Sequence, residues 1–200
     1  MDRLGVASWL KKYEIINYTI NEDLSVDIVG DVNLVDKGLN KILVKFRNIS
    51  GYFACSNNKL LDLEGCPISV GGNFVCNDNG LISLNGCPKT VGGHFYCHDN
   101  YLVNLVGCPS RVGGNFACDR NKITSLEGCP ARVSGFFDCS NNELSSLECG
   151  LVSVCGAFDC SDNKLSDSES HMYDYNAYEQ VVSYYKSKNL NIELQERLED

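Results

Sequence analysis

The sequence lacks the features that mark several large classes of protein. No apolar run approaches the ~18 residues of a transmembrane helix, and the opening MDRLGVASWLKKYEII has an early acid and no uninterrupted apolar core of the signal-peptide type. Basic residues are few, since 17 Lys plus Arg stand against 26 Asp plus Glu, a net charge of −9. This balance argues against direct binding to nucleic acid or to an anionic membrane. We expect a cytoplasmic protein whose partner is a protein with a basic surface.

Motifs that carry chemistry are also missing. The GxSxG, HExxH, P-loop and dinucleotide-binding patterns are absent, and no CxxC pair offers a zinc site. The apolar fraction of 44% with 22% charged residues is typical of a globular chain with one ordinary core. We therefore expect a folded protein that is not an enzyme and that has no cofactor and no metal ion.

Cysteine, by contrast, is abundant, and its spacing is regular. Six of the 12 cysteines stand 21 residues apart, each two residues after a Phe and three before an Asn. These cysteines are Cys55, Cys76, Cys97, Cys118, Cys139 and Cys160, and the asparagines are Asn58, Asn79, Asn100, Asn121, Asn142 and Asn163. With the apolar positions that follow, the unit reads FxCxxNxLxxLxGCPxxVGGx. A degenerate first copy, with Val32 on the Phe position and Lys37 in place of Asn, begins near Gly30.

This unit resembles the leucine-rich repeat. A fixed period of 20 to 29 residues with LxLxxNxLxxL spacing marks that family, and here Phe and Cys occupy the two strand positions normally held by Leu. Among its members the unit is most similar to the short repeats of bacterial and bacteriophage proteins. The resemblance covers residues 30 to 165 and implies an α/β repeat fold, a leucine-rich-repeat solenoid with a parallel concave sheet. A phage origin would place the protein in the host cytoplasm.

The flanks of the repeats read as caps that close the ends of the solenoid. Residues 1–29 form the expected N-terminal cap, a helix with Val6, Trp9 and Leu10 on one face followed by turns and short strands. Residues 30–165 form about seven repeats, and residues 166–200 form a C-terminal helical cap. Five tyrosines in that last segment leave open the alternative that it is a detachable, partner-binding helix.

Side-chain alternation along a strand predicts which residues face inward. Phe74 and Cys76 should point into the core and Val75 outward, and stacked turns should bury the inward face. We expect the Asn at the end of each strand to satisfy backbone groups, so that Asn58 to Asn163 form a structural ladder. A glycine-mediated bend is expected at Val70-Gly71-Gly72 and its equivalents.

The cysteines and histidines invite alternative interpretations. Equivalent cysteines on stacked strands lie ~4.8 Å apart, near enough for a disulfide by distance alone, but we favour reduced, buried, structural thiols. Cys155 replaces a Gly or Ser of the other repeats and leaves open a special thiol. His94 and His98 flank an inward Phe and Cys and should stand ~13 Å apart on one strand, too far to share a metal ion without a bend or a second chain.

The outward strand positions carry the candidate partner-binding surface. Aromatic and apolar residues there have no role in folding, and aspartates form an acidic arc around them. The candidate residues are Tyr52, Val75, His94, Tyr96, His98, Asp99, Asp119, Arg120, Phe136, Asp138 and Asp159.

These observations favour a non-catalytic protein-binding scaffold that uses its concave face. The phage resemblance implies that the protein inhibits a host enzyme or defence protein. The alternative is an acidic decoy that occupies the nucleic-acid groove of a host nuclease. A third hypothesis, a metal-dependent enzyme using His94, His98 and Asp99, predicts stoichiometric metal in the purified protein.

Overall fold

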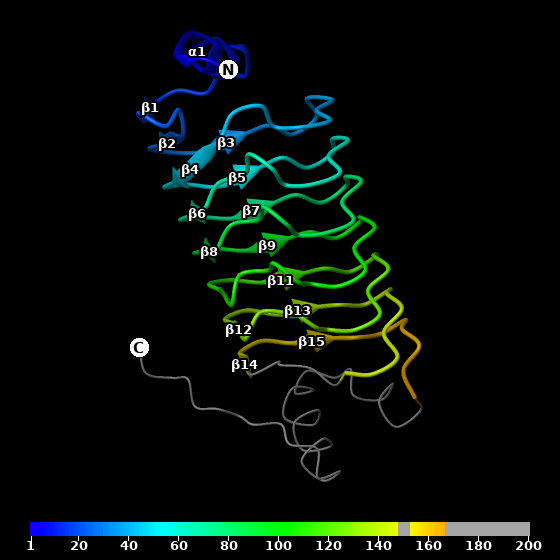
Figure 1. Ribbon diagram of the computed structural model, residues 1–200. Helices are drawn as coiled ribbons and strands as arrows, with labels where there is room; N and C mark the ends of the chain where they lie inside the picture. The colour runs from blue at the N-terminus through cyan, green and yellow to red at the C-terminus, as the bar shows by residue number, and fades with distance from the viewer. Residues whose placement is uncertain (148–152, 167–200) are drawn as a thin grey trace.

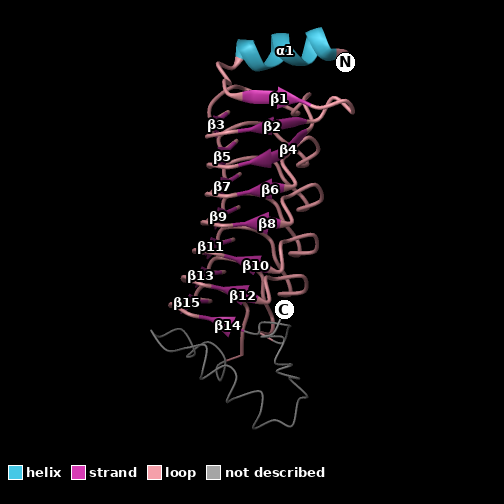
Figure 2. Cartoon of the chain, turned by 90° about the vertical axis from the view of Figure 1, so that its left-hand side faces the viewer, coloured by secondary structure: helices cyan, strands magenta, loops and turns pink. Residues whose placement is uncertain are grey.

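The chain winds into a regular stack of turns. The computed structural model describes residues 1–147 and 153–166, and in this part of the chain successive turns lie one above another with α1 at one end (Figure 1). Each complete turn of the repeat contributes two short strands, which build two separate sheets along the stack (Figure 2). The architecture is a parallel β-solenoid.

The first sheet has eight strands in the order β1-β2-β4-β6-β8-β10-β12-β14. Its pairs are parallel except for the antiparallel β1 and β2 at its N-terminal end. Its strands are β1 (Tyr18–Ile20), β2 (Val26–Ile28), β4 (Phe46–Ile49), β6 (Ser69–Val70), β8 (Thr90–Val91), β10 (Arg111–Val112), β12 (Arg132–Val133) and β14 (Ser153–Val154).

The second sheet has seven strands, all parallel, in the order β15-β13-β11-β9-β7-β5-β3. Its strands are β3 (Val32–Asn33), β5 (Phe53–Ala54), β7 (Phe74–Val75), β9 (Phe95–Tyr96), β11 (Phe116–Ala117), β13 (Phe137–Asp138) and β15 (Phe158–Asp159). The degenerate first repeat joins in register, because Val32 lies beside Phe53.

A column of phenylalanines runs along the core of the seven-stranded sheet. Neighbouring rings from Phe53 to Phe158 have centroids 5.1–5.8 Å apart, and each ring is almost fully buried. Beside it lie the buried cysteines of the repeat, among them Cys76 and Cys97. The predicted inward register of Phe and Cys is thus confirmed.

The glycine pair of each repeat makes the bend between the two sheets. Gly71 and Gly72 connect β6 to β7, as the sequence predicts. Close stacking requires glycine here, because a Cβ on Gly72 would lie 2.9 Å from the backbone carbon of Gly51 in the preceding turn. At these positions the requirement comes from lack of space between turns.

The expectation of an α/β repeat with one concave sheet is corrected by the eight-stranded sheet. From β6 onward, the segment that returns each turn to the Phe-Cys strand forms a two-residue strand such as Thr90–Val91, whose valine is buried. A 21-residue turn that also holds the Phe-Cys strand and the Asn turn leaves this segment too short for a helix of ordinary length.

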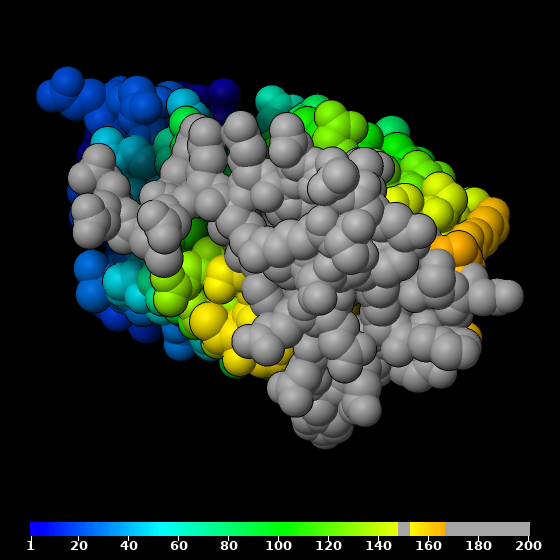
Figure 3. Space-filling model, turned by 90° about the horizontal axis from the view of Figure 1, so that it is seen from below, coloured from blue at the N-terminus to red at the C-terminus, as the bar shows by residue number. Residues whose placement is uncertain are grey.

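Helical caps at both ends are not supported. The only helix among the described residues is α1 (Arg3–Lys12), which begins after Asp2, whose side chain accepts a hydrogen bond from the N–H of Gly5 at 2.8 Å. Its Trp9 packs against Phe46, with ring centroids 6.1 Å apart, and so covers the first turn. The cap predicted over 166–200 lies, apart from Ser166, outside the described residues. Figure 3 views the stack from the end opposite α1, with the last described residues in orange at its rim.

Candidate functional site

The solvent side of the seven-stranded sheet, called the outer face here, is formed by the residues that alternate with the buried Phe and Cys. It comprises Tyr52, Ala54, Ser56, Asn73, Val75, Asn77, His94, Tyr96, His98, Asn115, Ala117, Asp119, Phe136, Asp138, Ser140, Ala157, Asp159 and Ser161. Most of these side chains are half-buried, because neighbours stand on adjacent turns. The repeat therefore fixes their backbone positions firmly.

Three rings form a row along β9 on this face. His94 and Tyr96 are stacked, with centroids 5.4 Å apart and planes inclined by 9°, and Tyr96 and His98 follow at 6.3 Å and 60°. We call these three residues the ring row. Their alternation on one strand, predicted from the sequence, places all three rings on the same side.

His94 also has a structural contact that the sequence did not reveal. Its ring Nδ1 accepts a hydrogen bond from the backbone N–H of Asn115 in the next turn at 2.8 Å. The backbone N–H of His94 donates to Oδ1 of Asn73 in the preceding turn at 2.8 Å. Asn115 continues this pattern by accepting the N–H of Phe136 at 3.1 Å. His94 thus belongs to a second ladder that ties neighbouring turns together, and removing its ring would disturb the fold as well as the surface.

Apolar side chains on the outer face are less exposed than the sequence implies. Tyr52, Val75 and Tyr96 are half-buried, and Phe136 is 37% exposed. The most exposed apolar groups of the repeats lie instead on a second surface, called the edge, formed by the residues one to three positions after each ladder asparagine. Leu61 on this edge is 64% exposed. This edge also carries Ile82, Tyr101 and Val103. Sequence reasoning missed it, although Leu61, Ile82 and Val103 recur at the 21-residue period.

The side chain of Arg120 partly neutralises the acidic arc. Arg120 donates from Nε to Asp99 Oδ1 at 2.9 Å, and its Nη2 lies 3.0 Å from Asp119 Oδ2. Burial opposes ionisation of Asp99, but hydrogen bonds from His98 and Arg120 and the charge of Arg120 outweigh it, so that the pKa of Asp99 is lowered.

Asp119 behaves differently from its neighbours. The residue is only 5% exposed, which corrects its assignment to an open partner-binding surface. Burial, and then the nearby charge of Asp138, raise the pKa of Asp119 despite the opposing effect of His98 and Arg120. Asp138 and Asp159 remain on the outer face, where each carboxylate accepts the N–H two residues on, from Ser140 at 3.0 Å and Ser161 at 2.9 Å.

The predicted asparagine positions form hydrogen bonds between turns. Asn121 is representative: its Oδ1 accepts the N–H of Leu102 at 2.9 Å, and its amide donates to the carbonyls of Cys97 at 3.1 Å and Cys118 at 3.0 Å. The same pattern recurs at Asn58, Asn79, Asn100, Asn142 and Asn163. The ladder holds the strand ends below the outer face in fixed register.

Successive turns also bring together a group of possible metal ligands. Asp78, His98 and Asp99 each place one donor atom within 4.8 Å of the other two. His98 and Asp99 are neighbours in sequence, and Asp78 occupies the position of Asp99 one turn earlier. The sequence-based hypothesis combined His98 and Asp99 with His94 and missed Asp78, whose signal was the 21-residue offset from Asp99.

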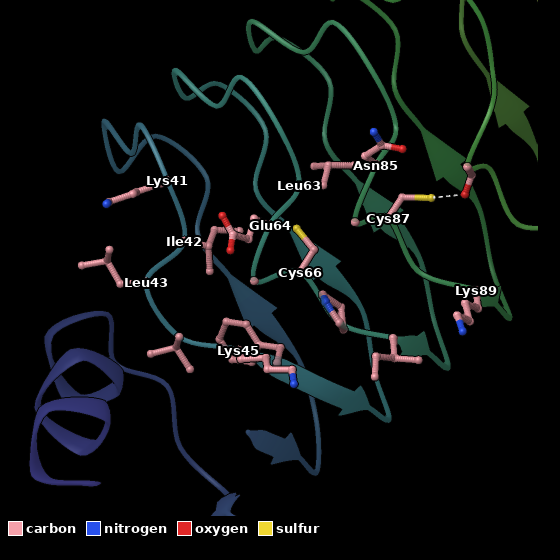
Figure 4. Close-up of a pocket in the computed structure, with 17 residues that line it drawn as sticks. Lys41, Ile42, Leu43, Lys45, Leu63, Glu64, Cys66, Asn85, Cys87 and Lys89 are labelled. Atoms are coloured by element: carbon pink, nitrogen blue, oxygen red, sulfur yellow. Dashed lines mark hydrogen bonds between the residues drawn. The ribbon is translucent and has the colours of Figure 1, made fainter. Parts of the chain in front are cut away.

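The Gly-Cys-Pro segments, which follow the leucines of each repeat, line a groove of about 670 Å³ (Figure 4). Lys41, Lys45 and Lys89 border it, and Cys66 and Cys87 also line it. Burial raises the pKa of Cys87 to about 12, and its thiol donates to the carbonyl of Gly107 at 2.9 Å.

The repeat thiols serve the core. Burial raises the pKa of Cys97 well above its usual range, and the same holds for Cys76. Free thiols are found at Cys55, Cys66, Cys76, Cys87, Cys97, Cys108, Cys118 and Cys155, of which Cys155 is exposed. The buried thiols among them, such as those of Cys76 and Cys97, act as small apolar residues of the core.

Fold and surface together define a repeat protein, a parallel β-solenoid that carries a rigid, patterned outer face and an N-terminal helical cap. No family model, curated protein or solved structure matches the chain. The one helix among the described residues, α1, lacks the length and apolar character needed to span a membrane.

Proposed function

We propose that this protein is a non-catalytic scaffold that binds a partner protein through its outer face. The observation that carries the proposal is the ring row: three neighbouring outward rings, of which His94 and Tyr96 are stacked, on a strand that is paired on both sides. Aromatic side chains that are already ordered lose little conformational entropy on binding, and such residues dominate protein interfaces.

The charges around the ring row define the kind of partner. Asp138 and Asp159 stand on the outer face within the following turns, while Asp99 and Asp119 share Arg120. A partner with basic side chains around an apolar contact would complement this pattern, and long-range attraction would speed its encounter. The bacteriophage resemblance of the repeats extends the proposal to a host enzyme or defence protein as the target.

Affinity capture with the native chain and with Tyr96→Ala/Phe136→Ala tests the proposal. These two substitutions remove outer-face rings and spare His94, whose ring supports the fold. Tyr101→Ala is the matched control, because it removes an exposed ring from the edge. Captured proteins are identified, purified and measured directly for affinity, and melting temperature is measured for every variant.

The proposal expects the double variant to weaken binding of one captured protein by at least about tenfold, and Tyr101→Ala to leave it within about twofold. Equal binding by all three folded proteins would contradict the outer-face proposal. Binding that disappears steeply with added salt and ignores both aromatic substitutions would favour the acidic decoy in its place.

A further inference from the structure

Side chains from two adjacent turns converge at the end of the ring row. Asp78 comes from one turn and His98 and Asp99 from the next, and one donor atom of each lies within 4.8 Å of the other two. His98 Nδ1 and Asp99 Oδ2 lie 2.7 Å apart. We propose that Asp78, His98 and Asp99, the triad below, form a binding site for a divalent transition-metal ion of the zinc class.

The distances suit such an ion after a small adjustment. Zinc bonds of about 2.0–2.2 Å to nitrogen and oxygen place two donors of a tetrahedral site roughly 3.3–3.6 Å apart. The His98–Asp99 pair must therefore open by under about 1 Å, and a donor pair as wide as 4.8 Å must close by up to about 1.5 Å. Rotation of side chains supplies such shifts, since Asp78 is exposed and His98 and Asp99 are half-buried.

The backbone beneath the triad is fixed by the repeat. Asp78 and Asp99 occupy equivalent positions and share a left-handed conformation, with φ of 52° and 51°. The backbone N–H of Asp78 donates to the carbonyl of His98 at 3.3 Å, which ties the two turns together at the site itself. Stacking brings the donors together before any ion binds, which reduces the ordering that binding requires.

The neighbouring arginine orients a ligand. Arg120 holds Oδ1 of Asp99 at 2.9 Å and leaves Oδ2 directed toward His98, as outer-sphere groups do for carboxylate ligands. Its charge opposes a cation, but its Nη2 lies 3.0 Å from Asp119, and the local count is three carboxylates against one guanidinium. The local field therefore favours a divalent ion.

The donor set selects the class of ion. One imidazole nitrogen with two carboxylates suits zinc and cobalt(II), whereas calcium, magnesium and manganese prefer oxygen-rich sites and copper(I) prefers sulfur. Three protein ligands leave at least one position for water or for a group from another molecule. The inference does not depend on the proposed partner, because the triad belongs to this chain alone.

Cobalt(II) titration of the full chain, followed by visible absorption, tests the site. Cys155→Ser serves as the background, so that the exposed thiol does not compete. Asp78→Asn replaces one carboxylate ligand by a neutral, weaker amide oxygen and suits a left-handed backbone position, where Asn is well tolerated. Asp162→Asn is the matched control, because Asp162 has the same left-handed conformation four repeats further on.

We expect one cobalt(II) equivalent per chain, an absorption spectrum without thiolate charge transfer, and an apparent Kd raised at least about tenfold by Asp78→Asn and changed less than about twofold by Asp162→Asn. Zinc should displace the cobalt. No saturable binding, equal binding by both variants, or a thiolate spectrum would overturn the proposal.

A second readout protects the test against a variant that does not fold. In the background protein, NMR signals of the His98 ring should broaden or shift on adding cobalt(II), while those of His94, whose Nδ1 is held by Asn115, change less. Unchanged His98 signals at saturating cobalt would overturn the site even if an ion binds elsewhere.

Discussion

The side-chain oxygen of Asn100 accepts the backbone N–H of Leu81, nineteen residues earlier in the chain, at 3.0 Å. The amide of the same asparagine donates to the carbonyls of Cys76 and Cys97 at 3.2 and 3.1 Å. One buried side chain therefore satisfies backbone groups of two turns. Such a group is costly to remove, because the polar atoms that it pairs are left buried without partners.

Asn100→Ala is expected to lower the free energy of unfolding by about 1 to 3 kcal/mol. Asn77→Ala should be close to neutral, because Asn77 lies on the outer face and its amide donates only to the exposed Asp78. Chemical denaturation of both variants makes the comparison. Equal losses of stability in the two variants would show that the buried ladder asparagine contributes no more to stability than Asn77 on the outer face.

Gly114→Ala should destabilise the fold by about 1 to 3 kcal/mol through overpacking. A Cβ at this position would lie 2.5 Å from Nδ1 of His94, which is fixed by its bond to Asn115. Ser134→Ala, at the other residue of the bend one turn later, is the control and should be nearly neutral. Thermal unfolding that ranks the two variants in the opposite order would refute this account of the glycine bend.

Asp27 should make stability dependent on acid pH. Burial opposes its ionisation, but hydrogen bonds from Asn21, Asn48 and Arg47 outweigh it and hold the pKa of Asp27 below its ordinary 3.8. Ionised Asp27 therefore stabilises the folded state above pH 3.8, and this contribution is lost as the pH falls through the lowered value. Asp27→Asn should lower the Tm near neutral pH and converge with the native protein in strong acid; a Tm difference independent of pH would contradict this.

Alkylation should distinguish the exposed thiol from the buried ones. The thiolate is the reactive form, and with a pKa of about 12 Cys87 has almost none of it near pH 8. Iodoacetamide should modify Cys155 in the native protein and Cys87 only after unfolding, as read by peptide mass spectrometry. Equal labelling of Cys87 and Cys155 in the native state would mean that the groove opens.

The core could be predicted from the sequence because its signal repeats. Period-two alternation around Phe95 and Cys97 recurs every 21 residues, so a single correct register applies to every turn. The eight-stranded sheet was missed because most of its strands contain only two residues, as in Thr90–Val91, too few for any alternation to be visible. Its buried valine was the available clue.

The outer face was predicted less well than the core. Alternation gives the side of the sheet on which Asp119 and Asp138 emerge, but whether a carboxylate is covered depends on neighbours in adjacent turns. Asp119 is buried beside Arg120, whereas Asp138 is half-buried. Contacts between residues 20 or 21 apart, such as Asp78 with His98, require the stacking to be known first.

The phenylalanine column also has a mechanical consequence. Each turn from Phe74 to Phe137 is held by its two neighbours, so a force applied at the ends should peel turns from the stack one at a time. Each step would release 21 residues, a contour length on the order of 70 Å. Under load the protein should therefore lengthen in equal increments, one for each turn that leaves the stack.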